Sequence, residues 1–430
     1  MKKLLILALI VSMMMTTNVS AATTNATSKP LWKEGNTANK IVVISDLHLG
    51  IDDKISETVA NREYLINFLK SLQVTKDVRE LVISGDFLDD WFLPLSYPAY
   101  SDTQGFYTKV IANNQAVFDE LNKIMNKGIE VVYVPGNHDM LLEAETLIKA
   151  LPKVTFVGAN GLGTYITGVR NEIAIEHGNR YDIFSAPDTV DNKDITNKNR
   201  ILPPGYFYAR LAASWVLQGK PPIKKDIPEI TTIPRRTDTD QYGAYMNYLI
   251  WNSTVNRFTN IERFDDKVYD LKIAGFNGKY SVKDIYPVLQ ADGKISAPIL
   301  FKDFQKSWDE RQTINGVSVK SSFIDAAIGA STGDSTNYFP KQLELQYVGK
   351  DIDIVVFGHT HYPLIKKFDS GITTVNEGTW IDHNTSYPGG LSRIFAVITT
   401  GKKTTAEVYS YETDGKIKNV TEAVTVKTSN

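Results

Sequence analysis

Five short apolar runs in this sequence each end in a cluster of polar side chains, and this pattern constrains the fold more than any other feature. The runs are rich in β-branched residues, which is typical of strands buried on both faces. They cover 40–45, 80–84, 130–134, 172–175 and 353–357. Functional sites of open α/β sheets form at the carboxyl ends of the strands. We therefore expect the five polar clusters to meet at one edge of a sheet.

Amphipathic segments between these runs predict helices. A helix with Ser56 as its N-cap is expected to place four apolar side chains on one face: Leu65, Phe68, Leu69 and Leu72. A second helix is expected over about 116–125, with Gly128 placed to end it. Strands that alternate with helices predict an α/β protein.

The N-terminus has the pattern of a secretory signal peptide. Lys2 and Lys3 precede an apolar stretch over 4–15, and small residues follow at Val19-Ser20-Ala21. The apolar stretch is short for a membrane span. We expect residues 1–21 to be a signal peptide and 22–39 a polar linker. The mature chain would be exported, to a periplasm or outside the cell, without a transmembrane anchor.

The rest of the chain divides into two parts of a core and an insertion between them. The core is expected over 40–185 and 346–430, because the region 186–345 lacks the alternation of strands and helices. Within that insertion, 200–236 carries seven basic residues and two acidic ones. This stretch either forms a solvated helix face or binds an anionic substrate. The candidate substrate contacts from it are Arg200, Arg210, Lys224 and Lys225.

Composition excludes several classes of function. The 430 residues contain no cysteine, so thiolate metal sites and cysteine nucleophiles are excluded. With 47 basic and 49 acidic residues, the chain has no excess of positive charge to hold duplex nucleic acid. Five of the six histidines fall in the strand-end clusters, and the sixth, His383, is interpreted as a loop histidine.

The clusters together carry the side chains of a metal site. In order they are Asp46-x-His48, Gly85-Asp86-x-x-Asp89, Gly136-Asn137-His138-Asp139, His177-Gly178 and Gly358-His359-Thr360-His361. Carboxylates, imidazoles and an amide oxygen without sulfur suit divalent Mn, Fe or Zn. Two ions about 3.5–4 Å apart, bridged by one carboxylate, can bind both the attacking and the leaving oxygen of a displacement at phosphorus.

The ordered motifs resemble those of the calcineurin-like metallophosphoesterases. The resemblance covers about 40–181 and 351–380. It implies a four-layer α/β/β/α sandwich, to which 186–345 would add a large, mainly helical insertion. It also implies two divalent metal ions as cofactors and an anionic phosphoester as substrate.

The same resemblance implies a role for each motif residue. One metal ion would be held by Asp46, His48 and His361. The second would be held by Asn137, His177 and His359, with Asp86 bridging the two ions. His138 matches the histidine that contacts phosphate and protonates the leaving oxygen, and Asn137 would also contact substrate. Asp89 matches the carboxylate that orients this histidine and raises its pKa, and Asp139 is given a supporting role.

One departure from the family narrows the substrate. Serine/threonine protein phosphatases carry arginine directly after the second aspartate of GDxxD, where this chain has Asp90. A negative charge at that position argues against that branch. The stretch 86–91 is instead similar to the UDP-2,3-diacylglucosamine pyrophosphatases, which supports phosphoester or pyrophosphate chemistry without identifying the substrate.

These patterns and the resemblance predict an exported phosphoesterase in which a hydroxide held by two metal ions attacks phosphorus in line. Two alternatives stay open. One is a nucleotide or nucleic-acid hydrolase of the 5′-nucleotidase or exonuclease type. The other is an exported binding protein built on an inactive phosphoesterase scaffold, although the intact ligand set speaks against it.

Overall fold

The computed structural model describes residues 28–196, 201–222, 228–258, 264–332 and 334–427. The signal peptide expected over 1–21 and the first part of the linker lie outside these ranges. Three of the candidate substrate contacts, Arg200, Lys224 and Lys225, also lie outside them.

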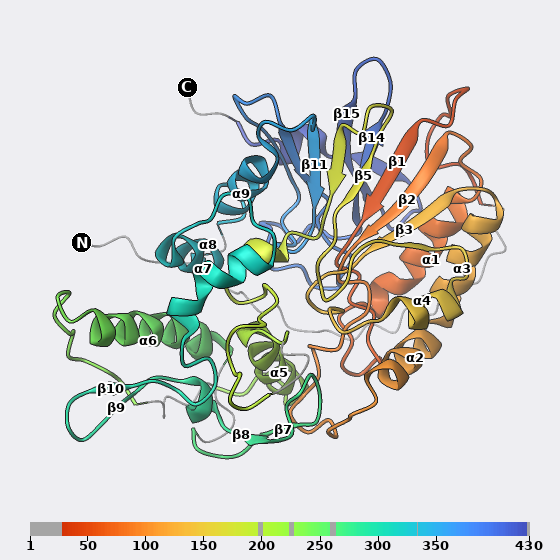
Figure 1. The fold of residues 1–430 in the computed structure, drawn as a ribbon. Helices are drawn as coiled ribbons and strands as arrows, with labels where there is room; N and C mark the ends of the chain where they lie inside the picture. Colours follow the sequence, from red (N-terminus) through yellow and green to blue (C-terminus); the bar gives the residue numbers. More distant parts are fainter. Residues whose placement is uncertain (1–27, 197–200, 223–227, 259–263, 333, 428–430) are drawn as a thin grey trace.

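Two mixed sheets form the centre of the molecule (Figure 1). The larger sheet has the strand order β16-β15-β14-β1-β2-β3-β4. Its strands are β1 (Lys40–Ile44), β2 (Val78–Ser84), β3 (Glu130–Val134), β4 (Thr155–Phe156), β14 (Ile394–Thr399), β15 (Thr405–Tyr411) and β16 (Ile417–Asn419). Strands β1 to β4 run parallel to one another, whereas β14 pairs antiparallel with β1.

The smaller sheet has the order β12-β13-β11-β6-β5. Its strands are β5 (Tyr165–Thr167), β6 (Ile173–Ile175), β11 (Ile354–Phe357), β12 (Leu364–Lys367) and β13 (Thr373–Asn376). All five predicted strands are therefore confirmed, but they do not share one sheet. Three belong to the larger sheet and two, β6 and β11, to the smaller one, so the polar clusters come from the ends of two neighbouring sheets.

The two sheets pack face to face through alternating side chains. On β1, Ile41 and Val43 point toward the smaller sheet, while Val42 and Ile44 belong to the cluster on the helical side. This alternation follows from the two-residue period of a strand. Both faces of β1 are apolar and fully buried, which explains why its sequence is a continuous apolar run.

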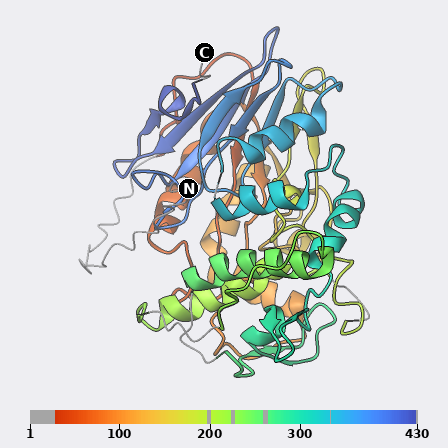
Figure 2. The ribbon, with the colours of Figure 1, turned by 90° about the vertical axis from the view of Figure 1, so that its left-hand side faces the viewer.

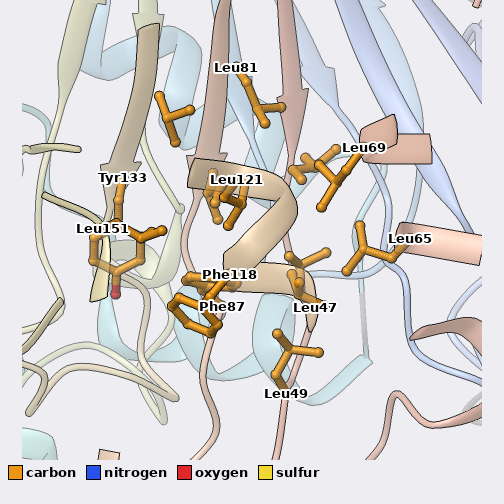
Figure 3. Packing of buried hydrophobic residues seen from close by; sticks show 14 of the residues in the cluster. Leu47, Leu49, Leu65, Leu69, Leu81, Phe87, Phe118, Leu121, Tyr133 and Leu151 are labelled. Atoms are coloured by element: carbon orange, nitrogen blue, oxygen red, sulfur yellow. The ribbon is translucent and has the colours of Figure 1, made fainter. Parts of the chain in front are cut away.

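Four helices share the hydrophobic cluster on the outer side of the larger sheet. They are α1 (Ala60–Leu72), α2 (Thr103–Asn113), α3 (Gln115–Asn126) and α4 (Ala144–Ala150). Figure 3 shows Leu65 and Leu69 of α1 and Phe118 and Leu121 of α3 packed together beneath Leu81 of β2. Both predicted helices are thus confirmed, and the four apolar side chains predicted for one face of the first helix are buried.

The start of α1 differs from the prediction. Ser56 does not cap the helix; its hydroxyl donates to the carbonyl of Asp52. The helix begins at Ala60, and its first N–H groups donate to the carboxylate of Asp382. A side chain more than 300 positions away therefore caps the N-terminus of α1 in place of a local N-cap residue.

Helix α9 (Tyr338–Tyr347) covers the outer face of the smaller sheet, where Phe339 and Leu343 pack against Val355 of β11. The order of layers in the core is thus helix, sheet, sheet, helix. Short elements complete this part of the chain: η1 (Asn179–Tyr181) follows β6, and α10 (Thr421–Val424) follows β16.

Most of the rest of the region 186–345 lies below the two sheets in Figures 1 and 2. Its helices are α5 (Pro204–Leu217), α6 (Thr239–Phe258), α7 (Phe304–Ile314) and α8 (Phe323–Thr332). Helices α7 and α8 lie beside the lower end of the smaller sheet. Strands β7 (Tyr269–Leu271) and β8 (Gly278–Tyr280) pair, as do β9 (Val288–Leu289) and β10 (Ile295–Ser296), and η2 (Val282–Ile285) lies between the pairs.

An aromatic cluster fills this region and includes Phe207, Trp251 and Trp308. Trp91 and Met140, which follow two of the polar motifs of the core, belong to the same cluster. The insertion is therefore packed directly beside the motif loops. Among the described helices, none combines the length and the apolar character that a membrane span requires.

Candidate metal centre

The motif residues follow their strands in sharp turns that bring the side chains together. Five of them have left-handed backbone conformations, with φ values between +41° and +66°: Asp46, His48, Asp86, His359 and His361. Residues other than glycine rarely adopt this region, and each such case costs about 1–3 kcal/mol. Strain of this kind persists where the surrounding structure holds it in place, and it is typical of functional sites.

One glycine allows two motif loops to meet. A Cβ atom at Gly136 would lie 2.5 Å from the backbone nitrogen of Asp86, which no side chain can do without moving a loop. Asp139 then ties the same loops together, because its carboxylate accepts from the N–H groups of Gly136 and Phe87, each at 2.7 Å. This is the supporting role expected for Asp139.

Asp46, His48 and His361 form the first group of potential ligands. The Nε2 atoms of His48 and His361 are 3.1 Å apart, and Oδ1 of Asp46 lies 3.0 Å from Nε2 of His361. Despite this short distance, Oδ1 of Asp46 accepts no well-aligned hydrogen bond and is buried. A buried carboxylate oxygen without such a partner is costly, and a cation between these three atoms would satisfy it.

Asp86, His177 and His359 form the second group. Nε2 of His177 lies 3.1 Å from Oδ2 of Asp86 and 3.2 Å from Oδ1 of Asn137. The same Oδ2 of Asp86 is 3.7 Å from Nε2 of His48, which belongs to the first group. Asp86 therefore lies between the two groups, where a bridging carboxylate is needed.

Hydrogen bonds on the outer side of the site decide which imidazole nitrogen faces inward. Nδ1 of His177 donates to the carbonyl of Ser84 at 2.8 Å, so Nε2 is the ring nitrogen that faces Asp86. Nδ1 of His48 lies 2.9 Å from Oδ2 of Asp89, and Nε2 again faces inward. Such outer contacts fix the tautomer and orientation of metal-binding histidines.

Charge in the site favours cations. Burial by itself raises the pKa of Asp86, but the adjacent His177 and His138 outweigh this effect and hold the pKa well below its usual range. The pKa of Asp46 is also lowered, because the neighbouring His361 and His48 outweigh its burial. Ionised, buried carboxylates beside imidazoles, without sulfur, are a donor set that fits two divalent ions such as Mn, Fe or Zn.

His138 lies at the edge of these groups, and its ring also comes within ligand distance of His48 and Asp86. Its Nδ1 lies 3.0 Å from Oδ2 of Asp89, and its backbone N–H donates to Oδ1 of Asp86 at 2.8 Å. The ring packs on Trp91, and its side chain remains 16% exposed. Burial lowers the pKa of His138, but the Asp89 and Asp86 carboxylates overcome this and raise it. The protonated form is thereby favoured.

The structure places Asp90 in the interior. This side chain is fully buried, and neither carboxylate oxygen has a hydrogen-bond partner among the described residues. Burial and the adjacent Asp89 raise the pKa of Asp90 well above its ordinary value, which favours the uncharged carboxyl group. Position 90 lacks the arginine of the protein phosphatases, as the sequence indicates, and its carboxyl group is held away from solvent.

Arg210 also differs from the prediction. It is buried on α5, and its guanidinium donates to the carbonyls of Leu93 and Pro94 and to the hydroxyl of Tyr206. These bonds fasten the insertion to the loop after the GDxxD motif. Arg210 is thus a packing residue in this structure and not an open contact for an anionic substrate.

Two carboxylates near the site carried no signal in the sequence. Glu57 reaches to 3.5 Å from Nδ1 of His48, and its side chain is 24% exposed. Asp182 lies 2.9 Å from Nε2 of His359. Both are single acidic residues in loops outside the recognised motifs, so only the folded structure could identify them. His383, interpreted as a loop histidine, is exposed and belongs to neither ligand group.

Solved structures similar to this chain include a Vps29 single mutant from Entamoeba histolytica, which is 11% identical, with 88% of this chain and 96% of that chain covered and a TM-score of 0.31. A dimetal phosphatase from Danio rerio is 10% identical, with coverages of 89% and 96% and a TM-score of 0.32. The phosphopantetheinyl hydrolase from Mycobacterium tuberculosis is 12% identical, with coverages of 80% and 90% and a TM-score of 0.24.

No curated protein sequence matches this chain. The sequence profile of the calcineurin-like phosphoesterases matches residues 39–363, which is well over half of its length. The chain therefore belongs to the calcineurin-like phosphoesterase family of metal-dependent phosphoesterases.

Proposed function

We propose that this protein is an exported phosphoesterase that hydrolyses a phosphate ester or a pyrophosphate with two divalent metal ions. The observation that carries the proposal is the position of Asp86. Its Oδ2 atom lies 3.1 Å from Nε2 of His177 in one ligand group and 3.7 Å from Nε2 of His48 in the other. One carboxylate that serves two ligand groups is the arrangement that a two-metal site requires.

The residues divide between two ions. Asp46, His48 and His361 would hold one ion, and Asn137, His177 and His359 the other, with Asp86 between them. When bound, the two ions would supply positive charge to the phosphoryl oxygens and lower the pKa of water. Asn137 and His138 then meet the substrate from the same loop, which orients the phosphoryl group toward the ligand groups.

His138 supplies the proton for the leaving oxygen. Because Nδ1 is held by Asp89, the Nε2–H is the donor that remains for the substrate. The Asp89 carboxylate raises the pKa of His138 and favours the protonated form that this role requires. The partial exposure of the ring allows contact with a substrate that enters from solvent.

The location and substrate are inferred from the sequence. The signal-peptide pattern of residues 1–21 supports export, and the similarity of 86–91 to the UDP-2,3-diacylglucosamine pyrophosphatases supports a phosphate ester or pyrophosphate as substrate. The basic stretch that would favour a nucleotide contributes no open contact at Arg210. A monoester, a diester and a nucleotide are therefore compared directly in the test.

The test measures hydrolysis of p-nitrophenyl phosphate, bis-p-nitrophenyl phosphate and ATP by the purified mature chain. Each reaction is run with Mn²⁺, with Zn²⁺ and with a chelator, and bound metal is counted by elemental analysis. We expect metal-dependent turnover that Asp86→Asn abolishes and that the surface variant Asp119→Asn retains. Turnover that survives both the chelator and Asp86→Asn would contradict a two-metal mechanism. A wild-type chain that binds no metal and turns over no substrate would support the inactive-scaffold alternative.

A further inference from the structure

Asp182 makes a direct contact with one of the candidate metal ligands from outside the motifs. Its Oδ2 atom lies 2.9 Å from Nε2 of His359. The other ring nitrogen of His359, Nδ1, is buried and has no hydrogen-bond partner among the described residues. His359 belongs to the ligand group with Asp86 and His177. An unpartnered nitrogen in this position is the atom that a metal ion would use.

The contact fixes the tautomer of His359. A carboxylate oxygen cannot donate, so the proton must lie on Nε2, and Nδ1 keeps its lone pair. His48 and His177 are arranged in the opposite sense, with Nδ1 held from outside and Nε2 turned inward. Without Asp182, no other described group holds Nε2 of His359, and the ring could turn or shift its proton to Nδ1.

A tight turn holds the Asp182 carboxylate in place. Its Oδ1 atom accepts from the N–H of Phe184 at 2.8 Å, and Oδ2 also accepts from the hydroxyl of Ser185. The carbonyl of Asp182 accepts from the N–H of Ala186 at 2.7 Å. The carboxylate is therefore set before any metal ion binds.

The insertion fastens this turn. Arg311 of α7 has a fully buried side chain, and its guanidinium donates to the carbonyls of Ile183 and Ala186 at 3.2 and 2.7 Å. The hydroxyl of Tyr338, at the start of α9, donates to the carbonyl of Tyr181 directly before the turn. The turn that carries Asp182 is thus clamped by two helices far along the chain.

We propose that Asp182 is a positioning residue that holds His359 with Nδ1 directed at the second metal ion, and that Arg311 fastens the turn from the insertion. The inference rests on the proposed two-metal site and assigns to the insertion a part in building it. Loss of an outer hydrogen bond to a metal-binding histidine costs about 10–100-fold in metal affinity. We expect Asp182→Ala to lower the affinity for one of the two ions by this factor and to leave the other unchanged.

The first measurement is Mn²⁺ binding by calorimetry on the metal-free full chain. The variants are Asp182→Ala, Asp182→Asn and, as a matched control on α7, Asp309→Asn, whose carboxylate is 78% exposed and bonded to Lys320. Asp182→Asn should lose less affinity than Asp182→Ala, because its amide oxygen can still accept from Nε2. Equal affinities of wild type and Asp182→Ala at both sites would overturn the proposal.

The second measurement separates positioning from a general structural role. In a His359→Ala background, Asp182→Ala should change metal affinity no further, because Asp182 acts through that imidazole. Nitrogen-15 NMR of the metal-free protein should report a proton on Nε2 of His359 in the wild type and a mixture of tautomers in Asp182→Ala. A further loss of affinity in the double variant, or an unchanged tautomer, would contradict the assignment.

Failure of this inference is distinguishable from failure of the proposed function. If the wild type binds two ions and Asp182→Ala binds them equally well, only the role of Asp182 is wrong. If the wild type binds no metal ion, the two-metal site itself is wrong.

Discussion

The Oδ2 atom of Asp89 lies 3.0 Å from Nδ1 of His138. The same oxygen lies 2.9 Å from Nδ1 of His48, so one carboxylate oxygen serves two imidazoles with different tasks. Its other oxygen accepts from the N–H groups of Trp91 and Phe92, which prevents the carboxylate from turning. Asp89 thereby connects the proposed proton donor to the first ligand group.

His138→Gln should slow turnover without emptying the site. The variant removes the proton donor, which is worth about 10²–10⁴-fold in rate, but leaves every proposed ligand side chain in place. We expect the kcat for p-nitrophenyl phosphate to fall within that range, while elemental analysis still finds the metal content of the wild type. An unchanged kcat would remove His138 from the reaction.

Asp89→Asn should affect both rate and metal binding. An amide has one acceptor oxygen, whereas this position needs one for the backbone N–H groups of Trp91 and Phe92 and one for the two imidazoles. The outer contacts of His138 and His48 are therefore weakened. We expect a lower kcat together with a metal affinity about 10–100-fold weaker at one site. Calorimetry beside the activity assay separates this result from that of His138→Gln, where affinity is retained. A normal metal affinity in Asp89→Asn would show that His48 needs no such partner.

Metal ions should stabilise the folded chain. The buried carboxylates of Asp46 and Asp86 lie 3.8 and 3.7 Å from Nε2 of the same residue, His48, and a bound cation would offset their negative charge. At a free ion concentration of 100 times Kd, each site adds about 2.7 kcal/mol to the free energy of unfolding. The midpoint temperature of thermal unfolding should therefore rise when Mn²⁺ is added and fall when it is chelated. The midpoint of Asp86→Asn should change less. A midpoint that does not depend on metal would contradict binding to the folded state.

Asp382→Ala should destabilise the protein without touching the ligands. Its carboxylate accepts from the N–H groups of Val59, Ala60 and Asn61 at the start of α1. Loss of hydrogen bonds to a charged group at a helix N-terminus costs about 1.5–3 kcal/mol. Urea unfolding should report this loss, and the neighbouring variant His383→Ala should unfold as the wild type does. Equal stabilities would mean that solvent caps α1 equally well.

The buried Asp191 of the insertion should make stability depend on pH. Burial and the nearby Asp188 raise the pKa of Asp191 from 3.8 to about 7, and its Oδ2 atom accepts from the hydroxyl of Ser307. The folded state therefore keeps a proton that the unfolded state releases, so this contribution to stability is present below pH 4 and is lost as the pH rises to about 7. The slope is at most about 1.4 kcal/mol per pH unit.

Asp191→Asn removes this titration, and its urea unfolding should show a flatter profile between pH 4 and 7 than the wild type. The surface variant Asp194→Asn, in which the ion pair with Lys302 is removed, is the control and should keep the wild-type slope. Identical slopes in wild type and Asp191→Asn would mean that Asp191 is ionised in the folded state.

Local sequence was sufficient for the five strands that carry the motifs and for the order of the motifs, but it did not predict the other strands of the two sheets. A strand buried on both faces must be apolar throughout, so runs such as 130–134 are visible without any knowledge of their partners. The residues after these strands match the motifs of the phosphoesterase family in order, and this resemblance is why roles for Asp46, Asp86 and His177 could be predicted before any distance was known. How these strands divide between two sheets depends on pairing between distant segments. This pairing cannot be predicted from the apolar runs themselves.

Only the tertiary structure decided which residues far apart in the sequence contact each other. Asp182 and His359 are 177 positions apart, and Asp382 caps a helix 321 positions before it. Arg210 shows the same limit from the other side, because the sequence offers it as a candidate substrate contact and packing buries it in the fold. Burial decides whether a charged side chain faces the substrate or the protein interior, and burial depends on how the whole chain packs. The sequence by itself therefore determined which chemistry this protein carries, and the fold decided which side chains hold that chemistry in place.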